Sequence, residues 1–276
     1  MSRVSRFVKR NRLSTRKAYW RLFNSYAPNA KPVYILGVQR SGTTLLLDCL
    51  EKSLEFDVLG ESSRAMVDFR IRNDDDIKQI IRLSRHKVVV FKPLTDSHRA
   101  REFLQLIPNS VAIWAFRRVE DRASSAVAKF GDHNLQVLRE FSVGKGFQRW
   151  QAQGLTEESL ALIRRFDYSD MTPESAAALF WYIRNSLFFS MGLDRMDSVL
   201  PLAYEDLVSH PRETMQGICR FIDGEYKEVM IKNIHAKSLG RSQMQLPEQI
   251  SSLCNSMYEK LHQVQKDRWN HLKLGR

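Results

Sequence analysis

The feature that most constrains the fold is a glycine-rich segment directly after a short apolar run. The run is Val33–Leu36, and the segment reads Gly37-Val38-Gln39-Arg40-Ser41-Gly42-Thr43-Thr44. A glycine, four further residues, a second glycine and a Ser or Thr two positions later is the spacing of a phosphate-binding loop. The backbone N–H groups of such a loop converge on an anion, and the helix that follows directs its N-terminal dipole to the same place. The segment therefore predicts a strand, a phosphate-binding loop and a helix, in that order.

One position differs from the loops that hydrolyse ATP or GTP. Those loops place Lys before the final Ser or Thr, where it bridges the β- and γ-phosphates while the hydroxyl holds magnesium. Here that position is Thr43, and a basic residue stands earlier, at Arg40. The loop is poorly equipped for triphosphate hydrolysis, but it can still hold a 5′-phosphate while Arg40 reaches the group to be transferred. An ordinary glycine turn capped by threonine is the alternative, which the flanking strand and helix disfavour.

Further apolar runs alternate with helical patterns. Strands are also expected at Lys87–Phe91, Val111–Phe116 and Val199–Ala203, because uninterrupted apolar runs suit strands buried on both faces of a parallel sheet. Helices are expected at Thr44–Leu54, Asp76–Ser84, Arg99–Leu106, Asp121–Phe130, Pro173–Met191, Pro211–Ile222 and Pro247–Gln265. The alternation predicts a single α/β domain over residues 31–276, with a P-loop-containing parallel sheet flanked by helices on both faces. Ligands of such folds bind at the carboxyl ends of the strands.

Charge and cysteine content narrow the ligand and the compartment. The 43 Lys+Arg against 31 Asp+Glu give a formal net charge of +12, which favours acidic ligands such as nucleotides, sulfated or phosphorylated acceptors, nucleic acid and anionic membrane. Cys49, Cys219 and Cys254 are far apart and lack metal-ligand spacing, so neither zinc nor a disulfide framework is expected. No apolar run approaches the ~20 residues that cross a bilayer, and no signal-peptide pattern is present. These features predict a cytoplasmic protein.

Residues 1–30 form a basic N-terminal segment. They include eight Lys or Arg residues and no acidic residue. We interpret the segment as an arm or helix, either packed on the domain by its aromatic residues or in contact with a membrane surface or anionic partner. The packed helix is the favoured interpretation, because runs of charge are usually just solvated.

A second anion-binding pattern follows the third predicted strand. That strand ends in Arg117, and Ser125 lies eight residues beyond it on the next predicted helix. An arginine at the carboxyl end of a strand offers a forked donor to a phosphate, and a serine on the following helix can add a hydroxyl. The alternative is that Arg117 and Arg118 only pair with Glu120 and Asp121.

Together the two patterns resemble the donor-binding motifs of sulfotransferases, which use 3′-phosphoadenosine 5′-phosphosulfate (PAPS). The residues from Gln39 to Leu45 are similar to that family's 5′-phosphosulfate loop, and Arg117 with Ser125 is similar to its 3′-phosphate motif. The resemblance implies transfer of a sulfuryl group from PAPS to a hydroxyl or amine, with PAP as product and no metal. It assigns donor binding to Arg40, Ser41, Gly42, Thr43, Thr44, Arg117 and Ser125.

Looser similarities extend the resemblance over residues 33–241. Tyr204-Glu205-Asp206-Leu207 is similar to a strand-to-helix junction of the family. Lys237-Ser238-Leu239-Gly240-Arg241 resembles the late basic loop that closes over the nucleotide, which makes Arg241 and Ser238 candidate donor contacts. The longer, Trp-containing form of that loop is lacking here. The chain therefore resembles Golgi-type and bacterial sulfotransferases more than the cytosolic small-molecule enzymes.

Sulfuryl transfer resembles phosphoryl transfer and needs cations on the developing charge, an acceptor held in line and a base for its proton. Arg40 is one candidate cation. Lys92, at the end of the second predicted strand, is another and matches the family's post-strand lysine. Glu61 resembles the base of tyrosylprotein and related Golgi-type sulfotransferases, and His98, six residues past Lys92, is the alternative base. Glu61 is favoured, because geometry outranks residue type for a base.

Other functions remain open. A P-loop small-molecule kinase predicts binding of ATP and magnesium, and the absent loop lysine argues against it. A basic nucleic-acid or membrane-binding module rests on the net charge, but no nucleic-acid motif supports it and no nucleic-acid partner is expected. A nucleotide- or anion-binding protein without turnover is a third alternative. The acceptor is unidentified, both monomer and homodimer fit the sequence, and an acidic or sugar-like acceptor is suggested by Arg64, Arg70, Arg72, Lys145 and Arg149.

Overall fold

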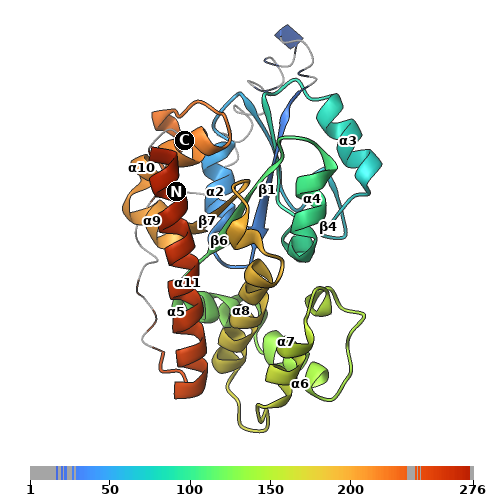
Figure 1. Ribbon diagram of the computed structural model, residues 1–276, viewed down its shortest axis with the longest axis vertical. Helices are drawn as coiled ribbons and strands as arrows, with labels where there is room; N and C mark the ends of the chain where they lie inside the picture. Colours follow the sequence, from blue (N-terminus) through green and yellow to red (C-terminus); the bar gives the residue numbers. More distant parts are fainter. Residues whose placement is uncertain are drawn as a thin grey trace.

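The computed structural model describes residues 17, 20, 22–23, 27, 29–234, 240, 242 and 244–273. At its centre is a five-stranded sheet in the order β2-β5-β1-β6-β7, and each neighbouring pair of strands is parallel. Helices cover both faces of this sheet (Figure 1), so the predicted α/β class and parallel sheet are confirmed. The strands are β1 (Lys31–Gly37), β2 (Phe56–Leu59), β5 (Val88–Phe91), β6 (Val111–Phe116) and β7 (Val199–Ala203).

The remaining elements connect these strands. A small antiparallel hairpin, β3 (Met66–Val67) and β4 (Arg70–Ile71), follows β2. The α-helices are α2 (Thr43–Leu50), α3 (Asp74–Arg82), α4 (Ala100–Leu106), α5 (Val119–Phe130), α6 (His133–Ser142), α7 (Glu157–Arg164), α8 (Pro173–Ser190), α9 (Tyr204–Ser209), α10 (Pro211–Phe221) and α11 (Glu248–Lys273). Short 3-10 helices are η1 (Leu94–Arg99), η2 (Trp150–Ala152), η3 (Leu193–Arg195) and η4 (Glu228–Met230).

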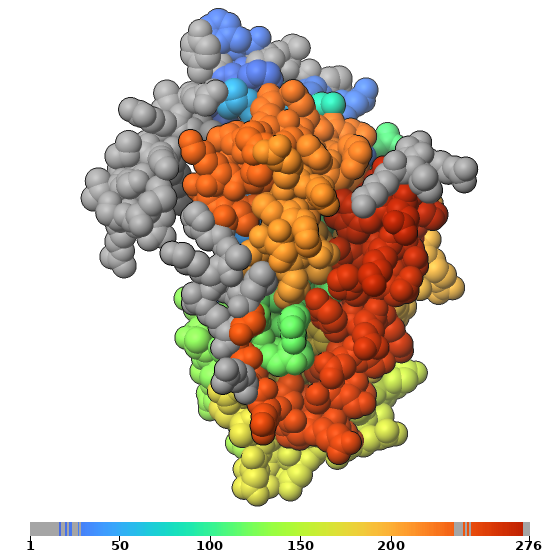
Figure 2. Space-filling view, turned by 90° about the vertical axis from the view of Figure 1, so that its left-hand side faces the viewer, coloured from blue at the N-terminus to red at the C-terminus, as the bar shows by residue number. Residues whose placement is uncertain are grey.

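Each face of the sheet has its own hydrophobic core. Successive strand residues point to opposite faces, so Tyr34 belongs to the core that includes residues of α3, α4, α5, α8 and α11, whereas its neighbour Ile35 belongs to the core that includes residues of α2, α9 and α10. This double burial explains why the strands carry apolar runs without polar alternation. A third core joins α6 and α7 to the outer side of α8, at the lower right of Figure 1. Figure 2 shows α11, in red, running beside α9 and α10, in orange.

The structure corrects the predicted end of the first helix. The helix α2 ends at Leu50 rather than Leu54, and the chain turns at Ser53, whose hydroxyl accepts a hydrogen bond from Glu55 N at 3.2 Å. The residues after the turn form the edge strand β2. Because Asp57 interrupts the apolar pattern of this strand, a search for apolar runs does not find it.

Two other boundaries shift for local reasons. The helix α3 begins two residues earlier than expected, because the Asn73 side chain caps it and accepts a hydrogen bond from Asp76 N at 2.9 Å. The last helix continues to Lys273 rather than Gln265. Within it, the Gln265 side chain accepts from Ala203 N at 2.8 Å and donates to Asp206 at 2.5 Å, which fastens the helix to the end of edge strand β7.

Most of the predicted N-terminal arm lies outside the described residues. Lys17 is described, and it is buried: its Nζ lies 2.8 Å from the Glu51 carboxylate and donates to Phe56 O at 2.9 Å. This one basic residue of the arm is therefore attached to edge strand β2 rather than solvated. No helix in the described ranges is both long enough and apolar enough to cross a membrane.

Candidate functional site

The phosphate-binding loop follows the central strand β1. Gly37 has φ +117° and Gly42 has φ +81°, values that favour glycine. A Cβ on Gly37 would lie 2.3 Å from Ala115 O, and a Cβ on Gly42 would lie 2.1 Å from Cδ2 of Tyr204. Both glycines are therefore needed for backbone conformation and for close approach, at β6 on one side and at Tyr204 on the other.

The loop offers polar groups that the described residues leave unused. The Ser41 side chain is buried, and its hydroxyl has no hydrogen-bond partner in the described part of the chain. The helix α2 begins without a side-chain cap and has no acidic residue in its first turn. Uncapped N–H groups at a helix start attract anions, and a buried hydroxyl without a partner is rare. These residues therefore suit a phosphate or sulfate group.

Ser97 supports the start of the loop and was not singled out from the sequence. Its Oγ accepts a hydrogen bond from Gly37 N at 3.1 Å and lies 3.2 Å from Gly37 O. Ser97 lies in η1, which follows β5, and its side chain contacts the last residue of the neighbouring strand β1. An isolated serine carries no motif, so only its position after a strand end could have indicated this contact.

The two predicted donor motifs lie together. Arg40, in a left-handed conformation with φ +72°, donates from Nε to Ser125 Oγ at 3.0 Å. These residues are 85 positions apart in the sequence. The loop after β1 and the helix after β6 therefore face one another at the carboxyl edge of the sheet, as expected for neighbouring parallel strands.

Arg117 is buried and held in place by two groups. Its guanidinium lies 3.5 Å from the Asp121 carboxylate and stacks over the Tyr204 ring, 4.3 Å from the ring centre. This is the same ring that fills the space beside Gly42. Tyr204 therefore links the phosphate-binding loop to the second motif, a role that the sequence-based interpretation as a structural junction did not include.

Asp121 also connects the late segment of the chain to the second motif. Its carboxylate accepts hydrogen bonds from Gly240 N at 3.1 Å and Ser242 N at 3.3 Å. The candidate contacts Ser238 and Arg241 lie outside the described residues. The pairing of Arg117 and Asp121, considered above as an alternative to phosphate binding, is present, and it holds the guanidinium in place at the strand end.

Lys92 and Glu61 meet beside the start of α2. The Lys92 side chain is 6% exposed, and its Nζ donates to Thr44 Oγ1 at 3.1 Å and lies 3.4 Å from Glu61 Oε2. The Glu61 side chain is 35% exposed. Residues from the first turn of α2, from the segment after β5 and from the segment after β2 thus converge at one edge of the sheet, with a buried cation between a hydroxyl and an accessible carboxylate.

His98 has a different environment. A Cβ on Gly154 would lie 2.6 Å from His98 Cβ, and the Nδ1 atom is buried without a hydrogen-bond partner among the described residues. Burial, followed by the nearby Arg184 cation, lowers the pKa of His98 to about 4. Within the described part of the chain, His98 forms no hydrogen bond or ion pair with Lys92 or Glu61.

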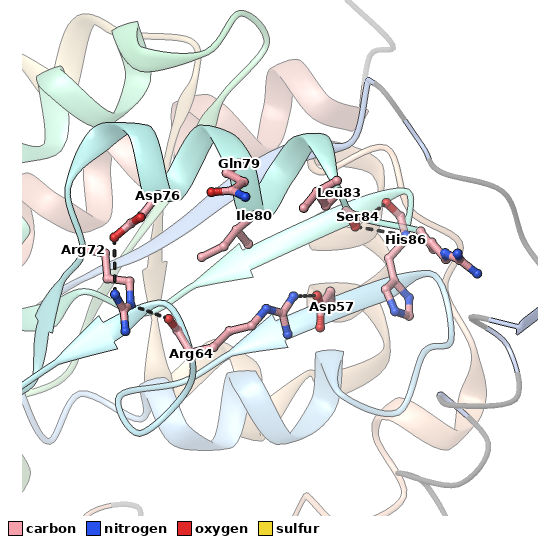
Figure 3. A pocket seen from close by; sticks show the side chains of 10 residues that line it. Asp57, Arg64, Arg72, Asp76, Gln79, Ile80, Leu83, Ser84 and His86 are labelled. Carbon is pink, nitrogen blue, oxygen red and sulfur yellow. Dashed lines mark hydrogen bonds and ion pairs between the residues drawn. The ribbon is translucent and has the colours of Figure 1, made fainter.

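A separate hollow lies between α3 and edge strand β2 (Figure 3). Arg64 and Arg72, two of the residues that suggested an acidic acceptor, point into it, and they pair with Asp57 at 2.5 Å and Asp76 at 3.3 Å. Arg70 and Arg149 are also in ion pairs, with Asp96 and Glu140. Carboxylates of the chain itself therefore partner these cations, which weakens the inference that they attract an acidic acceptor.

No protein-family model and no curated protein matches the sequence. Among solved structures, the chain is similar to the sulfotransferase domain from the curacin biosynthetic pathway, with a TM-score of 0.53, 16% identity, and coverage of 86% of this chain and 99% of that one. This likeness shows a shared fold.

Two further structures are more distant. The sulfotransferase domain from the Synechococcus PCC 7002 olefin synthase has a TM-score of 0.46 and 14% identity over 86% of this chain and 98% of that one. Mouse sulfotransferase SULT7A1 complexed with PAP has a TM-score of 0.37 and 13% identity over 78% of this chain and 66% of that one.

Proposed function

We propose that this chain is a sulfotransferase that moves a sulfuryl group from PAPS to a hydroxyl or amine of an acceptor. The observation that carries the proposal is the 3.0 Å hydrogen bond between Arg40 and Ser125. It joins the loop assigned to the 5′-phosphosulfate to the motif assigned to the 3′-phosphate. A nucleotide with anionic groups at both positions suits this arrangement, and the fold shared with a sulfotransferase domain supports the same activity.

The donor would be held at both of its anionic ends. The backbone N–H groups of the loop and the unused hydroxyl of Ser41 would hold the 5′-phosphosulfate, with Thr43 and Thr44 at the start of α2. Arg117, fixed by Asp121 and Tyr204, would pair with the 3′-phosphate together with Ser125. Because a guanidinium donates two parallel hydrogen bonds to a phosphate, a preoriented Arg117 would supply much of the donor affinity. The late segment, with Ser238 and Arg241, would cover the nucleotide.

The transfer itself would use the Lys92–Glu61 pair. The acceptor oxygen or nitrogen attacks sulfur, the bond between sulfur and the 5′-phosphate oxygen breaks, and PAP leaves with the electron pair. Glu61 would take the acceptor proton, while Lys92 and Arg40 would stabilise the negative charge that develops on the transferring and leaving oxygens. Glu61 is favoured over His98 because its carboxylate lies 3.4 Å from Lys92, whereas His98 lies against Gly154 and its Nδ1 atom is buried.

The donor assignment is tested by calorimetric titration of the purified protein with PAP in EDTA, with ATP as the control ligand. We expect micromolar binding of PAP and little binding of ATP. Arg117→Ala should weaken PAP binding by about tenfold or more, since a charge-assisted contact is worth about 1.5–3 kcal/mol. Arg118→Ala is the matched control, because its side chain is 58% exposed and pairs only with Glu120 in the described ranges.

Failure of the wild-type protein to bind PAP would refute the donor assignment. Binding of ATP only with magnesium would favour the kinase alternative, and salt-sensitive binding of nucleic acid without PAP binding would favour the binding-module alternative. Full turnover in EDTA, once an acceptor is found, is expected because the proposed chemistry uses only protein cations.

The base is tested by transfer of labelled sulfate from PAPS to a panel of aryl and sugar alcohols. Glu61→Gln should lower kcat by about 10²–10⁴-fold, the usual contribution of a general base, and should leave PAP affinity unchanged. Glu157→Gln, an exposed change on α7, is the control. A Glu61→Gln protein with wild-type kcat would refute the role of Glu61, and loss of turnover in His98→Gln instead would move the role to His98.

A further inference from the structure

Arg122, on α5, is a buried cation directly behind the phosphate-binding loop. Its side chain is fully buried, and its guanidinium stacks over Phe180, 5.6 Å from the ring centre. It donates from Nε to Gln39 O at 3.1 Å and from an Nη atom to Ala177 O at 2.7 Å. Both acceptors are neutral carbonyl oxygens, and within the described part of the chain no carboxylate forms an ion pair with Arg122.

A buried arginine without a carboxylate is costly for the fold. Removal of a full charge from water costs several kcal/mol even after relaxation, and carbonyl dipoles offset only part of that cost. Burial, and then the nearby Arg40 cation, lower the pKa of Arg122 to about 9, a shift that leaves the guanidinium charged at neutral pH. Arg40 on the loop and Arg122 behind it are therefore two neighbouring cations, and no carboxylate of the described residues forms an ion pair with Arg122.

The contact with Gln39 affects the geometry of the loop. In a trans peptide the C=O and the following N–H point in opposite directions. Because the Gln39 carbonyl is held toward Arg122, the N–H of Arg40 is directed away from Arg122, toward the opposite side of the loop. Arg40 itself has φ +72°, and alternation with left-handed residues is how successive N–H groups come to face one anion.

We propose that Arg122 is a positioning residue for the donor anion. It holds the Gln39 carbonyl away from the backbone N–H groups of the loop that would bind the anion, and the bound anion supplies the counter-charge that Arg122 lacks. This inference rests on the proposed function for the identity of the donor. It assigns to Arg122 a role in binding that is separate from its packing between α5 and α8. Arg122 acts through the loop backbone and through its field, without touching the ligand.

The chain offers a matched control in Arg184 on α8. Arg184 is also buried, donates to the carbonyls of Gln151 and Gln153, and stacks over Trp150 at 5.5 Å. Neither of its acceptors belongs to the phosphate-binding loop. If burial and packing are all that matter, substitution of either arginine by methionine should have the same kind of effect.

The experiment compares Arg122→Met, Arg122→Gln and Arg184→Met by calorimetric titration and by thermal unfolding with and without ligand. The probes are PAP and inorganic pyrophosphate, which needs no nucleotide contacts. We expect Arg122→Met to weaken both probes by about tenfold or more, while Arg184→Met stays within about twofold of the wild type. Without ligand, Arg122→Met and Arg184→Met should melt at similar temperatures, because each removes a buried charge that donates to carbonyl oxygens and has no carboxylate partner among the described residues.

Arg122→Gln separates the two parts of the role. Glutamine can still donate to the Gln39 carbonyl but has no charge, so we expect affinity between that of the wild type and that of Arg122→Met. It also provides a folded variant if the methionine substitution fails to fold. Folded Arg122 variants that bind both probes as tightly as the wild type would overturn the inference.

The outcomes distinguish this inference from the proposed function. If the wild type binds pyrophosphate but not PAP, the proposed donor is wrong, and the role of Arg122 is then tested by the effect of its variants on pyrophosphate affinity. If the wild type binds neither, both are refuted. If it binds both and only Arg117→Ala weakens PAP, the proposed function stands and the role of Arg122 is refuted.

Discussion

The substitution Gly42→Ala tests whether close packing between the phosphate-binding loop and Tyr204 holds the site together. Gly42 has φ +81°, and an added Cβ would lie 2.1 Å from Cδ2 and 2.8 Å from Cε2 of the Tyr204 ring. The Tyr204 side chain is buried and stacks against Arg117 at 4.3 Å. The ring cannot move away without disturbing Arg117, so the substitution should affect both stability and binding.

The cost has two parts. A non-glycine residue in the left-handed region costs about 1–2 kcal/mol, and displacement of a packed ring costs about 1–3 kcal/mol. The sum, about 2–5 kcal/mol of unfolding free energy, corresponds to a melting temperature lower by about 10 °C for a chain of this size. Because Arg117 moves with the ring, PAP affinity should fall by about tenfold as well.

Gly144→Ala is the matched control, because Gly144 has φ +75° and, apart from its two chain neighbours, no described residue has an atom within 4 Å of an added Cβ. It carries only the backbone cost of about 1–2 kcal/mol, with no effect on PAP binding. Differential scanning calorimetry measures both variants. A second substitution, Tyr204→Ala, should relieve the clash, so that the double variant is less destabilised than the sum of the single variants. Equal melting temperatures for Gly42→Ala and Gly144→Ala would refute the reasoning.

Two further predictions concern η1. Asp96 is buried, accepts a hydrogen bond from Ile71 N at 2.9 Å and pairs with Arg70 at 2.5 Å. Asp96→Ala should therefore lower the free energy of unfolding, measured by urea titration, by about 3–5 kcal/mol. A loss below about 1 kcal/mol would contradict this prediction. Burial lowers the pKa of His98 from 6.5 to about 4. Between about pH 4 and pH 6.5 the unfolded chain therefore binds more protons than the folded chain, and the free energy of unfolding falls as the pH drops through that window. His98→Gln should reduce this slope in urea titrations across the window, and an unchanged slope would argue against a neutral buried His98.

Much of the fold followed from local patterns. The runs that became β1, β5, β6 and β7 are apolar because these strands are covered on both faces, and that burial is visible in the sequence itself. The spacing of Gly37 and Gly42 identified the loop because the two positive φ angles are a local requirement. The strand β2 was missed because Asp57 breaks its pattern, although in the structure Arg64 pairs with that carboxylate.

The site was predictable only in part. Lys92, Arg117 and Ser125 could be placed at strand ends or on the following helix from the sequence, since the carboxyl edge of a parallel sheet is where ligands bind. Their partners could not be placed: the motif around Tyr204 did not indicate that its ring packs against Gly42, and Ser97, which contacts Gly37, belongs to no motif. A serine or tyrosine has the same sequence context whether it supports a loop or faces water.

The sequence by itself determined which residues form four of the five strands of the sheet, where the anion-binding loop turns and which cations follow the strand ends, because these depend on side-chain periodicity and on backbone angles that only glycine readily adopts. Only the tertiary structure decided that Arg40 meets Ser125, that Lys92 lies between Thr44 and Glu61, and that Arg122 is buried behind the loop. The strand order β2-β5-β1-β6-β7 differs from the order in the chain, so it brings distant segments together. Burial of a charge depends on those neighbours and not on the residues beside it in sequence.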